Sequence, residues 1–500
     1  MFRVMGSPKR LCNGMTRREA LRVGGLGAAG LGLNQLLHGE ILAGGTTDHL
    51  PGFGKAKRCI LLFLYGSPSQ LETFDMKPLA PLEIRGTMRP IASSLSGVPV
   101  CEHLPHTAKI MDRCTVVRSV NHPYPLHGVA FATTGVPAID VNMELNPFDS
   151  RHQPYFGSAL EFLDRKRRGG LSSTVQNVAL PFPFSSRRTD QPLRAGPYAA
   201  YLGSGYHPVW TEFQGKGTKT ITKSRANGEF TFTGPEPYLG CTRGSYFRLS
   251  ATNKQPGMTL DRLDRRRSLL KQFDGTRADL DRTLAGKSLT QFQSMAYSLL
   301  TSTKVADALD VRKENRETRD LYGMTLFGQG CLAARRLVEN GTRLATVFWD
   351  EYGLAGDAWD THWQHYPRMK DQLLPPFDKA FSGLILDLER RGMLEDTLVC
   401  CLSEHGRTPK LKTGNGGGRD HWSRAYSTIF AGGGMGRGKV VGETDKHASD
   451  VTEHPVSPKD LLATMYHLLG VSPHGQIPDR THRLVPLLPE GSDVVREMLA

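Results

Sequence analysis

Residues 376–406 read PFDKAFSGLILDLERRGMLEDTLVCCLSEHG. The first part, Pro376–Arg391, carries apolar residues at the 3.6-residue spacing of an amphipathic helix. The second part, Thr397–Leu402, is a short apolar run, which is typical of a strand that is buried on both faces. Strands that alternate with helices pack as a parallel sheet between two helical layers, so this stretch predicts an α/β fold.

The same alternation extends outward over most of the chain. Further strands are predicted at Cys59–Tyr65, Thr115–Val120, Asn177–Pro181, Arg343–Trp349 and Ser427–Ala431, and further helices at Leu104–Arg113, Pro154–Arg168, Phe327–Glu339 and from a cap at Ser457 to Leu469. Residues 183–250 and 258–322 break the pattern, so we expect insertions there: loops or a small β unit in the first, exposed helices in the second. The prediction is one three-layer α/β/α sandwich with a mostly parallel central sheet over residues 55–490.

Composition narrows the classes of protein to which the chain can belong. Of 500 residues, 39% are hydrophobic, which is too apolar for an intrinsically disordered chain. The net charge of +14 favours anionic partners or serves solubility alone, and no nucleic-acid-binding motif accompanies it. Beyond residue 50 the longest apolar run is Cys59–Tyr65, far short of the ~20 residues that cross a bilayer. No Gly-x-Ser-x-Gly elbow of a serine hydrolase occurs.

Residues 1–43 are typical of a twin-arginine export signal. Residues 16–21 read TRREAL, and a Gly/Ala/Leu stretch at Val23–Leu33 follows that is too short to span a membrane. The alternative is a buried amphipathic helix, which the glycines of that stretch disfavour. We therefore expect the twin-arginine machinery to export the protein to the periplasm or the cell exterior. The sequence is compatible with cleavage near Ala43 and with an uncleaved anchor.

Histidines and carboxylates lie next to the predicted strands, mostly just after a strand ends. They are Glu72 and Asp75 after the first strand, His127 after the second, Asp360 and His362 after Arg343–Trp349, Glu404 and His405 after Thr397–Leu402, and His421 before Ser427–Ala431. Ligands bind an open α/β sheet outside the carboxyl ends of its strands. Imidazole and carboxylate groups are the ligands that hold Zn, Mn or Ca ions. The pattern predicts a divalent-metal site; the alternative is that these histidines cap turns or pack on tryptophans.

Several motifs resemble the alkaline phosphatase and sulfatase superfamily. Residues 376–406 are similar to a helix and strand of that superfamily that end in Ser-Asp-His-Gly, and residues 460–488 are similar to its C-terminal segment. Four motifs are similar to the marks of an uncharacterised sulfatase-like branch with twin-arginine signals: Gly66–Asp75, Trp359–His362, Glu404–Pro409 and Gly418–Trp422. The resemblance implies an alkaline phosphatase-like sandwich.

The resemblance also implies roles for the candidate residues. One ion would be held by Asp360, His362 and His421, and a second by Glu404 and His405 with Glu72 or Asp75. From the residues themselves, His127 is a candidate metal ligand or general base, and the alternative is a packed loop histidine. Arg407 is a candidate contact for an anionic ester oxygen, and the alternative is a structural ion pair. The implied function is metal-dependent hydrolysis of sulfate or phosphate esters, with an anionic small molecule or polysaccharide ester as substrate.

The chain departs from that superfamily where its nucleophile would lie. Sulfatases carry Cys/Ser-x-Pro-x-Arg, and no such motif follows Thr115–Val120. Gly66 and Ser67 stand after the first strand, where related enzymes place aspartate, and Thr133-Thr134 matches the superfamily in placement only. The alternative function is therefore an exported, non-catalytic binding protein of the same fold that recognises an anionic polysaccharide.

Overall fold

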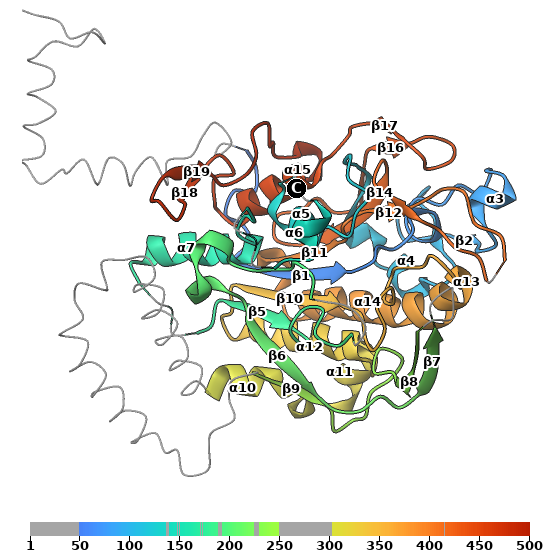
Figure 1. The fold of residues 1–500 in the computed structure, drawn as a ribbon, viewed down its shortest axis with the longest axis horizontal. Helices are drawn as coiled ribbons and strands as arrows, with labels where there is room; N and C mark the ends of the chain where they lie inside the picture. Colours follow the sequence, from blue (N-terminus) through green and yellow to red (C-terminus); the bar gives the residue numbers. More distant parts are fainter. Residues whose placement is uncertain are drawn as a thin grey trace, which may run out of the picture.

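The computed structural model describes residues 50–136, 140–147, 149, 151–170, 172, 174–188, 193–224, 230–249, 303–414 and 416–500. The predicted signal at 1–43 and residues 258–302 of the second expected insertion lie outside these ranges. The described residues form a central sheet between two layers of helices (Figure 1).

The central sheet has nine strands in the order β15-β4-β14-β11-β1-β10-β5-β6-β9. Their bounds are β1 Arg58–Leu64, β4 Cys114–Val120, β5 Asn177–Leu180, β6 Val209–Gln214, β9 Tyr246–Leu249, β10 Leu344–Trp349, β11 Thr397–Leu402, β14 Tyr426–Ala431 and β15 Lys439–Val441. Neighbouring strands are parallel except where β14 pairs with β11 and β4, and where β9 pairs with β6. The predicted α/β/α sandwich with a mostly parallel sheet is confirmed.

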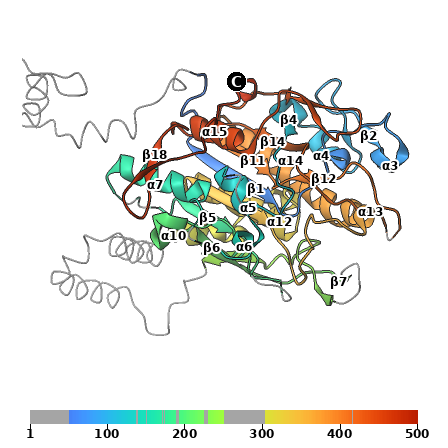
Figure 2. The same cartoon turned by 45° about the horizontal axis from the view of Figure 1, so that its top comes forward.

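Strand β1 shows why the sheet needs helices on both faces. Ile60, Leu62 and Leu64 point into one apolar cluster, while Leu61 and Phe63 point into the other. The first cluster includes buried residues of α12 (Leu326–Glu339) and α14 (Leu374–Arg390), and the second includes those of α7 (Phe156–Arg168) and α15 (Pro458–Leu468). The two helical layers lie on opposite sides of β1 in Figure 1, and Figure 2 shows the same fold with its top turned forward.

The ends of the predicted helices lie within about two residues of the observed ones, with one exception. Leu104–Arg113 is not a continuous helix: α4 covers only Pro105–Ala108, and a separate 3-10 turn covers Met111–Arg113. The predicted cap of the last helix is present, because Ser457 N donates to Asp460 Oδ2 at 3.0 Å. None of the described helices is long and apolar enough to cross a membrane.

The sequence did not predict two features of the sheet. Strand β14 is antiparallel, because the chain returns from β11 through the short pair β12 (Gly406–Arg407) and β13 (His421–Trp422) without a crossover helix. Within residues 183–250, β6 and β9 extend the central sheet, and only β7 (Thr220–Ser224) and β8 (Thr231–Pro235) form a separate hairpin. The described end of the second insertion is helical as expected, with α10 at Thr303–Leu309 and α11 at Arg316–Leu321.

Candidate metal centre

The carboxyl ends of β1, β10 and β11 meet at one edge of the sheet. Leu64 pairs with Trp349 and Phe63 with Leu402, so the loops after these strands start side by side. The loop after β10 returns to this edge, because Trp359 N donates to Tyr65 O at 3.0 Å. Gly66 (φ 91°) has to be glycine here, since a Cβ on it would lie 2.4 Å from Asp360 N.

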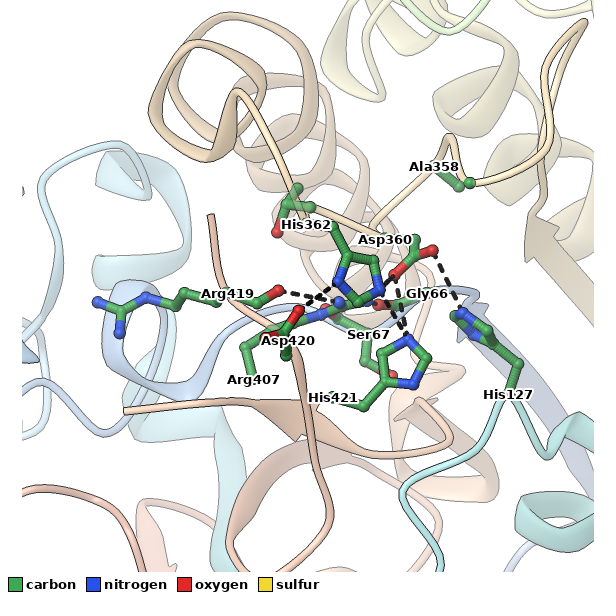
Figure 3. Close-up of polar contacts among 12 residues, drawn as sticks. Gly66, Ser67, His127, Ala358, Asp360, His362, Arg407, Arg419, Asp420 and His421 are labelled. Carbon is green, nitrogen blue, oxygen red and sulfur yellow. Dashed lines mark hydrogen bonds and ion pairs between the residues drawn. The ribbon is translucent and has the colours of Figure 1, made fainter. Parts of the chain in front are cut away.

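Histidine and carboxylate side chains from four segments of the chain converge at this edge. Figure 3 shows four of them, His127, Asp360, His362 and His421. In the described part of the chain they form two groups, His127 with Asp360, His362 and His421, and His127 with Glu404 and His405. Within each group, one ligand atom of every residue lies within 4.8 Å of the others. His362 Nε2 is 3.0 Å from His421 Nε2, and Asp360 Oδ1 is 3.0 Å and 3.3 Å from these two nitrogens.

Hydrogen bonds at the outer ring nitrogens fix the tautomers of three of these histidines. The acceptors of the Nδ1–H groups are Asp420 Oδ1 for His362 (2.7 Å), Pro125 O for His421 (3.0 Å) and Gly406 O for His405 (2.8 Å). A carbonyl or an ionised carboxylate only accepts, so each Nδ1 carries a hydrogen, and in the neutral ring the lone pair is on Nε2. With both rings neutral, the Nε2 atoms of His362 and His421 face each other at 3.0 Å as two acceptors, which repel unless a cation lies between them.

Asp420 is a residue of the site that the sequence analysis missed. Burial raises the pKa of its carboxyl, but Lys412 and His362 outweigh this effect and keep the pKa below its ordinary value, so Asp420 is ionised. A carboxylate on the outer nitrogen of a metal-binding histidine orients the ring and raises its basicity. Its position directly before His421, in a motif already recognised, was the available signal.

His127 joins the two groups of ligands. Its Nε2 is 3.2 Å from Asp360 Oδ2, and its Nδ1 is 3.0 Å from Glu404 Oε1. Burial opposes protonation of this imidazole, but the two carboxylates outweigh it and raise the pKa of His127 to about 9. Burial lowers the pKa of His405 and of His421, so these two rings are neutral and keep lone pairs for a ligand.

Two buried polar atoms of the second group have no hydrogen-bond partner among the described residues. They are Glu404 Oε2 and His405 Nε2, and both side chains are fully buried. Glu404 Oε1, by contrast, accepts from Gly66 N at 2.7 Å and from His127. Unpaired polar atoms at such depth are unfavourable by several kcal/mol unless a ligand satisfies them. The oxygen and imidazole nitrogen donors of this group lie within 4.8 Å of one another, which fits a divalent cation.

Glu72 and Asp75 belong to neither group. Glu72 Oε1 pairs with Arg419 Nη2 at 2.6 Å, and Glu72 Oε2 faces His365 Nε2 at 3.2 Å. Asp75 pairs with Lys77 Nζ at 2.9 Å. The structure therefore leaves both carboxylates in ion pairs beside the cluster, and the ligand set that we propose below omits them.

Three hydroxyl groups near the cluster and the Arg407 guanidinium have partners within the protein. The hydroxyls of Thr133 and Thr134 donate to helix carbonyls at 2.7 Å, and Ser67 Oγ accepts from His405 N at 3.1 Å. Arg407 is fully buried and donates to Asp360 Oδ1 at 2.7 Å. On the open side of the cluster lie the side chains of His362 and His421, which are 28% and 19% exposed.

Fold and site together define an α/β protein with a histidine–carboxylate cluster at the carboxyl edge of its sheet. The family described as "Protein of unknown function (DUF1501)" matches residues 56–499, so the chain belongs to that family. No curated protein matches the chain.

Solved structures show similarity at low sequence identity. One is the PsFucS1 sulfatase from Pseudoalteromonas sp., with 12% identity, 84% of this chain and 68% of that chain covered, and a TM-score of 0.37. Another is the phosphonate monoester hydrolase SpPMH from Silicibacter pomeroyi, with 12% identity, coverage of 88% and 76%, and a TM-score of 0.36. A third is Ps i-CgsB in complex with k-i-k-neocarrahexaose, with 12% identity, coverage of 86% and 74%, and a TM-score of 0.36.

The Glu72 ion pair predicts how stability depends on pH. Burial raises the pKa of Glu72, but Arg419 and His365 outweigh it and lower the pKa from the ordinary 4.5 to about 2. A depressed pKa stabilises the fold above the unfolded value, and the stabilisation, about 3 kcal/mol, is lost as pH falls from about 4.5 toward 2. Glu72→Gln should therefore lower the free energy of unfolding at pH 7 and flatten its decline in acid, as measured by urea denaturation.

Glu83→Gln is the matched control, because Glu83 is an exposed acid in the short helix α3 (Leu82–Arg85). It should keep the wild-type profile. An acid decline in Glu72→Gln as steep as that of the wild type would contradict the assignment.

Proposed function

We propose that this protein is a metal-dependent hydrolase of sulfate or phosphate esters. One observation carries the proposal: two imidazole nitrogens, which are both acceptors when the rings are neutral, face each other at 3.0 Å beside Asp360 Oδ1. Zn, Mn or Ca would relieve this repulsion. Asp360, His362 and His421 would hold one ion. His405 and Glu404 would supply the ligands on the buried side of the centre, and His127 lies between the two groups. When bound, the ion supplies Lewis-acid polarisation of the ester and neutralises its developing charge.

The protein residues set the direction from which an ester would approach. Glu404 and His405 are fully buried, whereas His362 and His421 are partly exposed, so the open side of the centre is the His362/His421 face. Pro125 and Asp420 hold these two rings in place through their Nδ1 atoms. The net charge of +14 favours the approach of an anionic ester or polysaccharide.

Water is the nucleophile that this site supports best. The hydroxyls of Ser67, Thr133 and Thr134 all have partners within the protein. The same observation favours the second candidate function, an exported binding protein that holds a metal and recognises an anionic polysaccharide without catalysis. Turnover separates the two functions.

Metal content is the first test of the proposal. We expect near-stoichiometric Zn, Mn or Ca in the purified protein by elemental mass spectrometry, and at least a ten-fold weaker retention in His421→Ala, because that change removes a ligand. The exposed His474→Ala variant is the control and should keep the metal. A folded wild-type protein that holds no metal after reconstitution would refute the proposal.

Ester turnover distinguishes hydrolase from binding protein. The metal-loaded protein should hydrolyse members of a panel of aryl sulfates and phosphates, and His421→Ala should lose at least 100-fold in kcat/KM while circular dichroism shows the fold retained. A folded, metal-loaded wild type that is inert across the panel, yet binds sulfated polysaccharide in calorimetry, would select the binding function.

We also propose export through the twin-arginine route, supported by the sequence of residues 16–21. Replacing both arginines (Arg17→Lys and Arg18→Lys) should retain the protein in the cytoplasm, as measured by cell fractionation with antibody detection. Equal export of the double variant and the wild type would refute this route.

A further inference from the structure

We infer that Arg407 is a positioning residue that holds the Asp360 carboxylate ready for the metal ion and does not contact the ester. The inference rests on the proposed metal centre. Arg407 belongs to β12, directly beyond the loop that carries Glu404 and His405, and its side chain is 0% exposed. A guanidinium that binds substrate needs donors that face solvent, whereas this one faces the protein interior.

All three guanidinium nitrogens of Arg407 donate to protein acceptors. Nη2 donates to Asp360 Oδ1 at 2.7 Å and to Gly66 O, Nε donates to Ser67 O at 3.2 Å, and Nη1 donates to Arg419 O at 3.3 Å. These acceptors lie in three separate segments: the turn after β1, the loop after β10 and the stretch before β13. One side chain thus ties the turn after β1 to two segments that carry proposed metal ligands, the loop with Asp360 and the stretch that leads to His421 (Figure 3).

The turn after β1 has a particular need for this contact. Gly66 and Ser67 both have positive φ, 91° and 69°, and a left-handed backbone is unfavourable for a serine. Such a conformation persists only where the surroundings over-determine it. Arg407 binds the carbonyls of both residues, while Gly66 N donates to Glu404 Oε1.

Arg407 acts on the proposed metal centre through Asp360. Its Oδ1 atom lies 2.7 Å from Arg407 Nη2 and 3.0 Å from His362 Nε2, and its Oδ2 atom lies 3.2 Å from His127 Nε2. A charge-assisted hydrogen bond from a rigid, planar guanidinium fixes the carboxylate plane. A ligand that is fixed before the ion arrives loses less conformational freedom on binding, so the affinity for the ion rises.

Gln70 fixes the main chain of Arg407 in turn. Gln70 Oε1 accepts from Arg407 N at 3.0 Å, and Gln70 Nε2 donates to Arg407 O at 2.9 Å. Both residues are buried. The two hydrogen bonds join the segment after β1 to the segment after β11. The two sequence motifs that contain Gln70 and Arg407 are therefore held in a fixed position relative to each other.

The test is the zinc affinity of Arg407→Lys, measured by competition with a chromophoric chelator. Lysine keeps the charge but loses the planar fork, so we expect zinc binding to weaken 10- to 100-fold, the usual effect of removing a partner of a metal ligand. Calorimetry with inorganic phosphate on the zinc-saturated proteins should give equal affinities for variant and wild type. Arg335→Lys is the control: Arg335 is also 0% exposed, but it pairs with Glu314 and Asp387, so zinc affinity should not change.

Each result decides one question. A folded Arg407→Lys protein with wild-type zinc affinity, or one that loses phosphate affinity alone, would overturn the inference. The second result would assign Arg407 to binding of the ester. If Arg407→Lys does not fold, Gln70→Met replaces it, and unchanged zinc affinity in that folded variant would overturn the inference equally. A wild-type protein that binds no zinc, manganese or calcium refutes the proposed function itself, before any variant is compared.

Discussion

The parallel register of β1 with β10 and β11 is the constraint on which the site depends. Because Leu64 pairs with Trp349 and Phe63 with Leu402, the three strands end at the same edge of the sheet. A backbone hydrogen bond then joins two of the loops, since Gly66 N donates to the Glu404 carboxylate of the adjacent loop at 2.7 Å. A slip of one residue in either pairing would turn every inward side chain of a strand to the other face, so the core that fixes the register also fixes the cluster.

The buried polar groups differ in whether their charges and hydrogen-bonding groups have partners within the protein. Buried carboxylates are tolerated when a guanidinium or imidazole neutralises them, as Arg419 does for Glu72. Around His362 and His421 the balance is incomplete when both rings are neutral, since their Nδ1 hydrogens then point outward and their Nε2 lone pairs face one another. In the proposed metal centre, a cation would remove this repulsion.

The sequence predicted what depends on local pattern and strand order. Apolar spacing in Pro376–Arg391 located a helix that is observed as α14, and the rule that ligands follow strand ends selected Asp360 and His405 as candidates. It did not predict what depends on contacts between distant segments. Glu72 stands near the end of β1 in sequence, but Arg419 holds it away from the cluster, and the carbonyl that fixes His421 belongs to Pro125, almost three hundred residues earlier in the chain.

The location of a bound ion shows whether His362 and His421 are metal ligands. Crystals of the protein soaked in zinc or manganese, measured at the absorption edge of that metal, give an anomalous difference map in which the ion is identified by element. We expect a peak within bonding distance of His362 Nε2, His421 Nε2 and Asp360 Oδ1, with both Nδ1 hydrogen bonds kept. A peak elsewhere, or rings turned so that Nδ1 faces the ion, would refute the proposed metal centre.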